Sequence, residues 1–207
     1  MIWSFYLLKM MVFQLVRRIT ARRARQQLAS SSSLINWNRA APELDQSLLH
    51  VWTDVITEEE EERLKDELVA TLRRRRYSKN HWDAVIVKFR ETERAWGSWE
   101  DDNRETLARM RSIVSEAIPD GASVNRFLGA AHVLDVAADG YILPHVDSVK
   151  ASGTLIAGLS LLSDCDMTLR YRPGMSAGDG WEQEMDTDSV VEVKLPRCVL
   201  FSFDHIT

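Results

Sequence analysis

Apolar residues recur at helical spacing in the first half of the chain. Leu64, Leu68 and Leu72 repeat every four residues, which places them on one face of a helix. Thr57 and Glu60 precede this stripe at the spacing of a capping box, in which each side chain accepts a hydrogen bond from the other residue's backbone N–H. The pattern therefore predicts an amphipathic helix that begins directly after Thr57.

A second helix is predicted over residues 99–118. Its apolar stripe consists of Leu107, Met110, Val114 and Ile118. The run Pro119-Asp120-Gly121 follows and ends the helix, because proline and glycine both interrupt helical structure. Residues 77–97, between the two helices, include the apolar run 84–87 and lie close to three tryptophans. This segment fits either a strand and loop that cover a pocket or ordinary packing of aromatic side chains in the core.

The period changes to that of strands from residue 130 onward. Strands are predicted at 131–137, 141–146, 154–162, 167–171, 190–195 and 198–203, with a further strand at 48–52 before the first helix. A turn is predicted at 138–140 and a loop at 172–180. Short strands separated by turn residues predict an α+β, mainly β fold, a sandwich or open barrel with the two helices packed outside.

Charge divides the chain at about residue 42. Residues 1–42 contain seven basic and no acidic side chains, whereas residues 43–207 contain 19 basic and 31 acidic ones. The first segment is rich in arginine and serine, which is typical of a mitochondrial transit peptide. A membrane anchor is less consistent, because the apolar stretch spans about 16 residues and spanning requires roughly 20. A secretory signal is also less consistent, because no clear small-x-small cleavage site follows the apolar stretch. We expect residues 1–42 to be a transit peptide and flexible leader, and residues 43–207 to form one domain.

Two further sequence features constrain the interpretation. Only two cysteines occur, so no disulfide framework is indicated, and a reducing compartment such as the mitochondrial matrix fits. The run Arg73 to Arg76 follows the first predicted helix. It fits a basic cluster at the negative end of the helix, and alternatively a nucleic-acid-binding patch.

The candidate chemistry lies in a His-x-Asp pair, His145 and Asp147. Imidazole and carboxylate ligands of this kind, joined by a second histidine, form the facial triad of non-haem Fe(II) oxygenases and leave open positions on the metal. His81 and Asp83 have the same spacing. By spacing alone, His81 and Asp83 could also combine with His132 into a rival triad, and any single pair is also compatible with a hydrogen-bonded loop.

Several ordered blocks of sequence resemble the AlkB-like 2-oxoglutarate- and Fe(II)-dependent dioxygenases, in particular a mitochondrial homologue. The resemblance extends from about Val51 to about Pro196. The matching blocks are LRRRRY (72–77), HWDA (81–84), FRETE (89–93), HVLD (132–135), GY (140–141), PHVDS (144–148) and IAGLSLLS (156–163). It implies a double-stranded β-helix (jelly-roll) core, with His145 and Asp147 as metal ligands. The block that contains His81 lies outside the iron site in this family.

The resemblance also implies features that the chain does not match. The family has a distal histidine and then an arginine after the strand equivalent to 198–203, and that arginine pairs with the outer carboxylate of 2-oxoglutarate. Here His205 is the remaining candidate for the third ligand, and no arginine follows Arg197. We therefore expect incomplete C-terminal strands, weak Fe(II) binding and little 2-oxoglutarate turnover by residues 1–207.

The resemblance implies an enzyme that uses Fe(II), 2-oxoglutarate and O₂ to oxidise a C–H bond. It associates the chain with regulation of programmed necrosis and fatty-acid metabolism. The acidic balance of residues 43–207 favours a protein or small-molecule substrate. The alternatives are a mitochondrial RNA (tRNA) demethylase, which would use the run Arg73 to Arg76 and nearby tryptophans, and a non-catalytic regulatory binding module.

Overall fold

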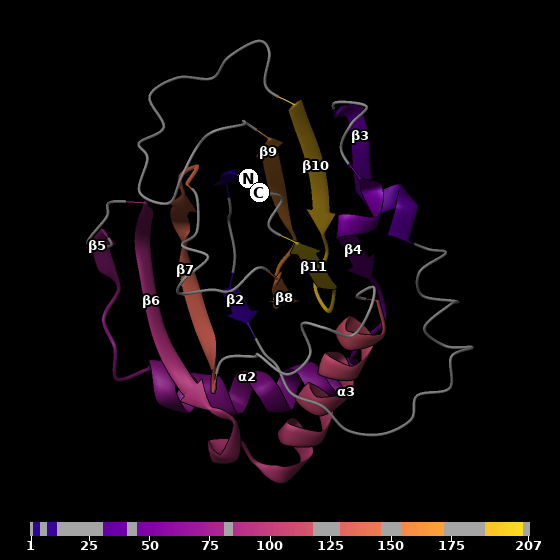
Figure 1. Ribbon diagram of the computed structural model, residues 1–207. Helices are drawn as coiled ribbons and strands as arrows, with labels where there is room; N and C mark the ends of the chain where they lie inside the picture. The colour runs from indigo at the N-terminus through magenta and orange to yellow at the C-terminus, as the bar shows by residue number, and fades with distance from the viewer. Residues whose placement is uncertain are drawn as a thin grey trace.

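Two antiparallel sheets and two helices make up the computed structural model, which describes residues 2–4, 8–11, 31–40, 45–80, 85–117, 129–145, 155–171 and 189–204 (Figure 1). The four-stranded sheet has the order β1 (Ile2–Ser4), β9 (Cys165–Tyr171), β10 (Ser189–Leu195) and β3 (Ile35–Arg39). The seven-stranded sheet has the order β4 (Leu49–Trp52), β11 (Leu200–Asp204), β8 (Leu155–Leu161), β2 (Leu8–Met11), β7 (Ala130–Ile142), β6 (Ile86–Ala95) and β5 (Ser78–Asn80). The helices are α2 (Glu58–Leu72) and α3 (Asp101–Ala117), and the 3₁₀ turns are η1 (Ser31–Leu34), η2 (Gln46–Leu48) and η3 (Trp96–Ser98). The predicted α+β, mainly β class is confirmed.

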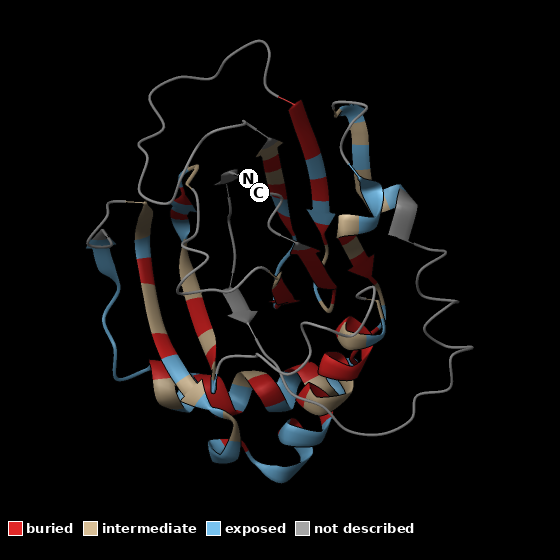
Figure 2. Cartoon of the chain, in the orientation of Figure 1, coloured by how far each residue is buried: buried red, intermediate tan, exposed pale blue. Residues whose placement is uncertain are grey.

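Hydrophobic cores lie on both faces of the seven-stranded sheet. One core joins α2 and α3 to the sheet and includes Leu64, Leu107, Val133 and Leu159. The other lies between the two sheets and includes Val51, Met167, Val193, Phe201 and Phe203. Strand alternation explains the division, because Leu200 faces the helices whereas Phe201 faces the opposite sheet. Figure 2 shows the resulting bands of buried residues along β10 and β11.

Helix α2 forms where the sequence predicts it, and the capping box is present. The backbone N–H of Thr57 donates to Glu60 Oε2 at 2.9 Å, and the N–H of Glu60 donates to Thr57 Oγ1 at 3.2 Å. Its stripe of Leu64, Leu68 and Leu72 is buried at 2% exposure or less. Helix α3 likewise confirms the second predicted helix, with boundaries shifted by one or two residues.

The predicted turn at residues 138–140 is wrong, because β7 continues from Ala130 to Ile142 without interruption. Gly140 serves a different purpose from a turn. A Cβ at this position would lie 2.6 Å from the carbonyl oxygen of Val87 and 2.7 Å from that of Lys88 on β6. Lys88 has a φ of 54° and lies where the β6–β7 register shifts. Four residues of β7 (137–140) lie opposite Lys88 alone, so the bulge is in β7, and the glycine allows it to pack closely against β6.

The segment between the two helices contributes strands to the main sheet. Strand β6 is ten residues long, pairs with β7 along most of its length, and has β5 on its other side. Trp99 is 2% exposed in the core under the helices, and Trp96 packs against that core, so both take the core-packing alternative. Trp82 lies outside the described residues.

Parts of the arginine-rich N-terminal segment also pair with the sheets. Strand β1 pairs with β9, β2 lies between β7 and β8, and β3 pairs with β10. The 3₁₀ turn η1 includes serines that the sequence assigns to a flexible leader. Processing of the leader and the domain boundary at residue 42 remain predictions. Among the described residues, no helix is long and apolar enough to cross a membrane.

Candidate metal centre

His145 lies just beyond the end of β7, on the segment that leaves the seven-stranded sheet. The sheet holds this segment in place, since the backbone N–H of Leu143 donates to the Val85 carbonyl at 2.8 Å. The His145 ring nitrogen Nδ1 lies 2.9 Å from the carbonyl oxygen of Leu143. Because a carbonyl can only accept, this hydrogen bond requires a proton on Nδ1, which leaves Nε2 as the nitrogen available to a metal. That tautomer is the one in which a histidine binds a metal through Nε2.

The other candidate metal ligands lie outside the described residues. These are Asp147 and His205, which the sequence groups with His145, and His81 and Asp83, which it groups with His132. Within the part of the chain that the structure describes, no three His, Cys, Asp or Glu side chains come together as a metal site would require. The ligand pair His145 and Asp147 therefore remains a prediction, which the tautomer of His145 supports.

The third member of the rival triad, His132, lies at the other end of β7. Its Nε2 is 2.8 Å from Glu91 Oε2 on the neighbouring strand β6. In the β6–β7 register His132 is opposite Glu93, whereas Ile142 is opposite Ile86 at the start of β6. The paired segment of β6, from Glu93 to Ile86, spans seven residues or about 23 Å of strand. His132 is therefore far from the sheet end that carries His145, and its hydrogen bond to Glu91 accounts for its position.

The run Arg73 to Arg76 lies at the C-terminal end of α2, as the helix-end interpretation predicts. The N–H of Arg73 donates to the Val69 carbonyl, and the N–H of Arg75 donates to the Leu72 carbonyl. Arg75 also donates from its side chain to Thr92 Oγ1 at 3.3 Å. The run thus closes the last turn of the helix, whose final carbonyls would otherwise lack donors.

Asp135 and its neighbours stabilise the same helix end from β6 and β7. Arg90 donates through Nε to Asp135 Oδ2 at 2.6 Å and through Nη1 to the Leu72 carbonyl at 3.2 Å. Tyr77 donates to the same Asp135 oxygen at 3.0 Å, and the Arg90 guanidinium lies 4.8 Å from the Tyr77 ring centroid. Burial, together with the Asp135 charge, raises the pKa of Tyr77 above its usual value. Tyr77 is therefore a neutral hydrogen-bond donor at physiological pH.

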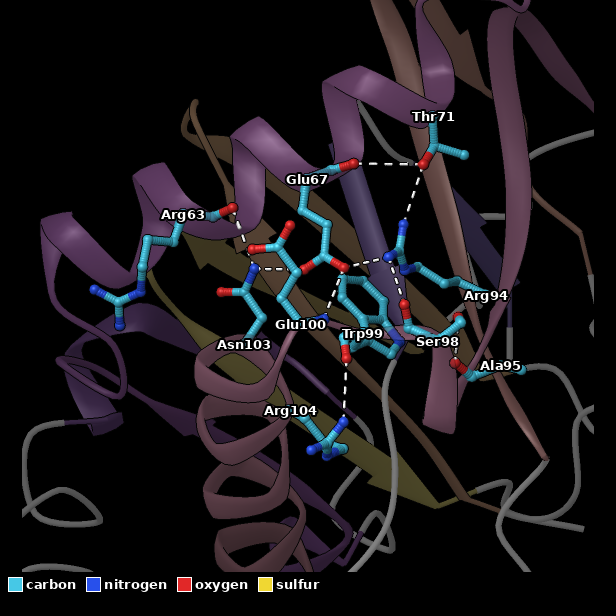
Figure 3. Close-up of polar contacts among 10 residues, drawn as sticks. All are labelled: Arg63, Glu67, Thr71, Arg94, Ala95, Ser98, Trp99, Glu100, Asn103 and Arg104. Carbon is cyan, nitrogen blue, oxygen red and sulfur yellow. Dashed lines mark hydrogen bonds and ion pairs between the residues drawn. The ribbon is translucent and has the colours of Figure 1, made fainter.

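A buried carboxylate, Glu67, connects α2 with β6 and α3 (Figure 3). Its side chain is 5% exposed and forms an ion pair with Arg94. Glu67 Oε1 also accepts the backbone N–H of Glu100 at 2.9 Å, just before α3 begins, and Oε2 accepts from Asn103 Nδ2 at 2.6 Å. Since the first N–H groups of a helix lack intrahelical partners, Glu67 acts as a cap supplied by another helix.

A second buried carboxylate, Glu61, holds two tight turns against α2. Its Oε1 accepts the N–H of Leu162 at 2.7 Å, and its Oε2 accepts from Arg197. Leu162 and Cys198, in the β8–β9 and β10–β11 turns, have φ values of 68° and 65°, which cost energy for residues other than glycine. Glu61 therefore stabilises two strained turns from one position.

The Glu61 carboxylate is ionised at neutral pH. Burial alone would raise its pKa, but the hydrogen bonds from Arg197 and Leu162 outweigh burial and hold the pKa below the usual 4.5. A lowered carboxyl pKa stabilises the folded state above the unfolded pKa, and this contribution is lost as the pH falls through the folded value. Acidification below about pH 4.5 is thus expected to loosen both turns.

The burial of Glu61 and Glu67 was not predicted from the sequence. A signal was present, since Glu61 precedes Leu64 by three residues and so continues the apolar stripe of α2. A carboxylate at an apolar-stripe position predicts a buried charge, which requires a partner. That partner, Arg197, lies 136 residues away along the chain, so local spacing could not identify it.

The Cys198 thiol is expected to react slowly with alkylating agents. Burial, and then the neighbouring Glu61 carboxylate, raise the pKa of Cys198 to about 11. At pH 8 only about 0.1% is thiolate, the reactive form. The rate of iodoacetamide modification, followed by mass spectrometry between pH 7 and pH 11, should rise steeply only near the upper limit. Glu61→Gln should raise the rate at pH 8. Modification of the native protein at pH 8 as fast as in urea would contradict a partly buried thiol held beside the Glu61 carboxylate.

The comparisons with known proteins point in the same direction as the sequence blocks. No protein-family model matches the chain. A mouse protein named alpha-ketoglutarate-dependent dioxygenase alkB homolog 7, mitochondrial, is 46% identical over 125 residues, which is 60% of this chain and 52% of the mouse protein. The Bos taurus protein of the same name is 48% identical over 110 residues, which is 53% of this chain and 46% of the relative. The chain thus spans about half the length of the curated relatives it matches. The resemblance to AlkB-like dioxygenases is confirmed, and over the matched stretch the chain is similar to mitochondrial alkB homolog 7.

Proposed function

We propose that this chain is a mitochondrial AlkB-like dioxygenase that uses Fe(II), 2-oxoglutarate and O₂ to oxidise a C–H bond of a protein or metabolite. The observation that carries the proposal is the identity of 46–48% with proteins named alpha-ketoglutarate-dependent dioxygenases. We further propose a location in the matrix, and a role in regulating programmed necrosis and fatty-acid metabolism, as the family resemblance implies.

His145 and Asp147 would hold the iron. The Leu143 carbonyl supports this assignment, because a hydrogen bond to Nδ1 orients the ring and makes Nε2 more basic. Bound iron supplies the activation of O₂ and of the co-substrate. The resemblance implies a jelly-roll core, and the two facing sheets with an apolar core between them are consistent with that fold.

Ile142, three residues before His145, is 3% exposed in the core between the sheets, whereas its neighbours Tyr141 and Leu143 are 37% and 45% exposed. The strand end that carries His145 is therefore apolar on its inner face and open to solvent on its outer face.

A protein or small-molecule substrate is favoured over RNA. The described surface of α2 and β6 combines arginines with carboxylates that neutralise them, including the Arg90–Asp135 and Arg94–Glu67 pairs. RNA recognition requires a continuous basic surface. Together with the acidic balance of residues 43–207, this supports a substrate that does not depend on many phosphate contacts.

Succinate release from 2-oxoglutarate tests the proposal. Release of succinate that requires Fe(II) and is lost in Asp147→Ala is expected. Fe(II) binding that depends on His145 without any succinate release would support the regulatory binding module instead. RNA that stimulates release, with affinity falling steeply as salt rises, would favour the demethylase alternative.

A further inference from the structure

A hollow of about 690 Å³ lies between α2, the end of β6 and the residues that precede α3. Its charged lining comprises Arg63, Arg73, Arg74, Arg94, Asp66, Glu67 and Glu100, and Figure 3 shows four of these side chains. This volume lies within the range of about 300–1,000 Å³ that small-molecule sites occupy. The hollow is separate from His145, because Arg94 lies near the opposite end of β6 from the strand end beside that residue.

The floor of the hollow is held rigidly by Arg94. Its Nη1 donates to Thr71 Oγ1 at 3.1 Å, and its Nη2 donates to the Ser98 carbonyl at 2.7 Å and to Glu67. The guanidinium also lies 4.7 Å from the Trp99 ring centroid. These contacts fix Arg94 at the base of the site, where its ion pair with Glu67 gives a nearly neutral, hydrogen-bonded floor.

The buried carboxylate in this lining does not oppose an anion. Glu67 is surrounded by Arg94, the backbone N–H of Glu100 and the Asn103 amide, which together compensate its charge. Asp66, at the rim, lies 3.6 Å from Lys65. Glu100 is therefore the main acidic group whose charge faces the hollow without a described cationic partner.

Arg73 and Arg74 provide the binding groups at the rim. Both side chains are exposed and line the hollow, and neither forms an ion pair or side-chain hydrogen bond within the described part of the chain. Arg75, in contrast, bonds to Thr92, and Arg76 does not contribute to the lining. Two members of the arginine run therefore line the hollow, a third is bonded to Thr92, and the fourth lies outside the lining.

We propose that this hollow binds a small molecule that carries a phosphate or pyrophosphate group, through Arg73 and Arg74 at the rim above Arg94. A guanidinium presents a planar pair of donors that matches phosphate oxygens and forms bidentate, charge-assisted hydrogen bonds. A compact ligand is favoured over RNA, because the basic groups converge on one hollow in a chain whose net charge is −5.

Calorimetric titration of the intact chain with inorganic pyrophosphate tests the proposal. The double variant Arg73→Ala/Arg74→Ala should weaken binding by about tenfold or more, because two charge-assisted bidentate contacts are lost. Arg76→Ala, a matched control from the same run, should leave the affinity within about twofold. Glu100→Gln should strengthen binding by removing a like charge.

Three results would overturn the proposal. These are the absence of saturable pyrophosphate binding, an equal loss in Arg76→Ala and in the double variant, and binding of an RNA oligonucleotide that pyrophosphate does not displace. All the substituted side chains are exposed, so circular dichroism should show an unchanged fold, and a loss of affinity then reports on the site.

Discussion

Glu67→Ala is expected to lower the free energy of unfolding by about 3–5 kcal/mol, a large part of the roughly 5–15 kcal/mol typical of a domain. The substitution removes the ion-pair partner of Arg94, whose side chain is only 17% exposed. It also removes the acceptor of the Glu100 N–H and one of the two acceptors of the Asn103 amide, which keeps its hydrogen bond to the Arg63 carbonyl. An uncompensated buried charge and two unsatisfied donors act in the same direction. Urea denaturation followed by tryptophan fluorescence measures the loss.

The neighbouring Asp66 provides the matched control for this prediction. Its side chain is 77% exposed on the same helix, so Asp66→Ala should change stability by no more than about 0.5 kcal/mol. Glu67→Gln keeps the shape and one acceptor and should lie between the two. Similar stability of Glu67→Ala and Asp66→Ala would show that the cluster contributes nothing beyond its exposed neighbours.

His145→Ala is expected to weaken specific Fe(II) binding by at least about 100-fold, since removing even the hydrogen-bond partner of a metal ligand costs about 10–100-fold. The hydrogen bond from Nδ1 to the Leu143 carbonyl leaves Nε2 as the ring nitrogen that can bind a metal. Asp147→Ala should have an effect of similar size. Anaerobic titration with Fe(II), followed by calorimetry, measures the affinity of each variant.

Two other histidines distinguish this assignment from its rivals. His81→Ala should retain Fe(II) binding, because the resemblance puts its block outside the iron site. His132→Ala should retain it as well, because that ring bonds to Glu91 at the far end of the strand, about 23 Å from the His145 end. A loss of metal in either variant as large as in His145→Ala would reject His145 and Asp147 as the ligand pair.

Local patterns in the sequence determined the elements of this protein. The spacing of Thr57 and Glu60 predicted the start of α2, and the capping box forms as expected. The apolar runs at 154–162 and 190–195 predicted strands that the structure places at β8 and β10. These predictions hold because capping, helical amphipathicity and strand alternation depend on residues within a few positions of one another. The candidate ligand His145 and the family resemblance come from the same kind of local information.

Tertiary structure alone decided which residues act together. The turn predicted around Gly140 proved to be a bulge within a continuous strand, where the glycine accommodates the close approach of the Val87 and Lys88 carbonyls of β6. The partners Glu61 and Arg197 are separated by 136 positions, and Glu67 and Asn103 by 36. Within the run Arg73 to Arg76, Arg75 is bonded to Thr92 whereas Arg73 and Arg74 line a hollow. Because the side chains are identical, the sequence alone could not predict this difference. Buried charges select partners by proximity in the folded state, so their pairing is determined by how the sheets and helices pack and not by spacing along the chain.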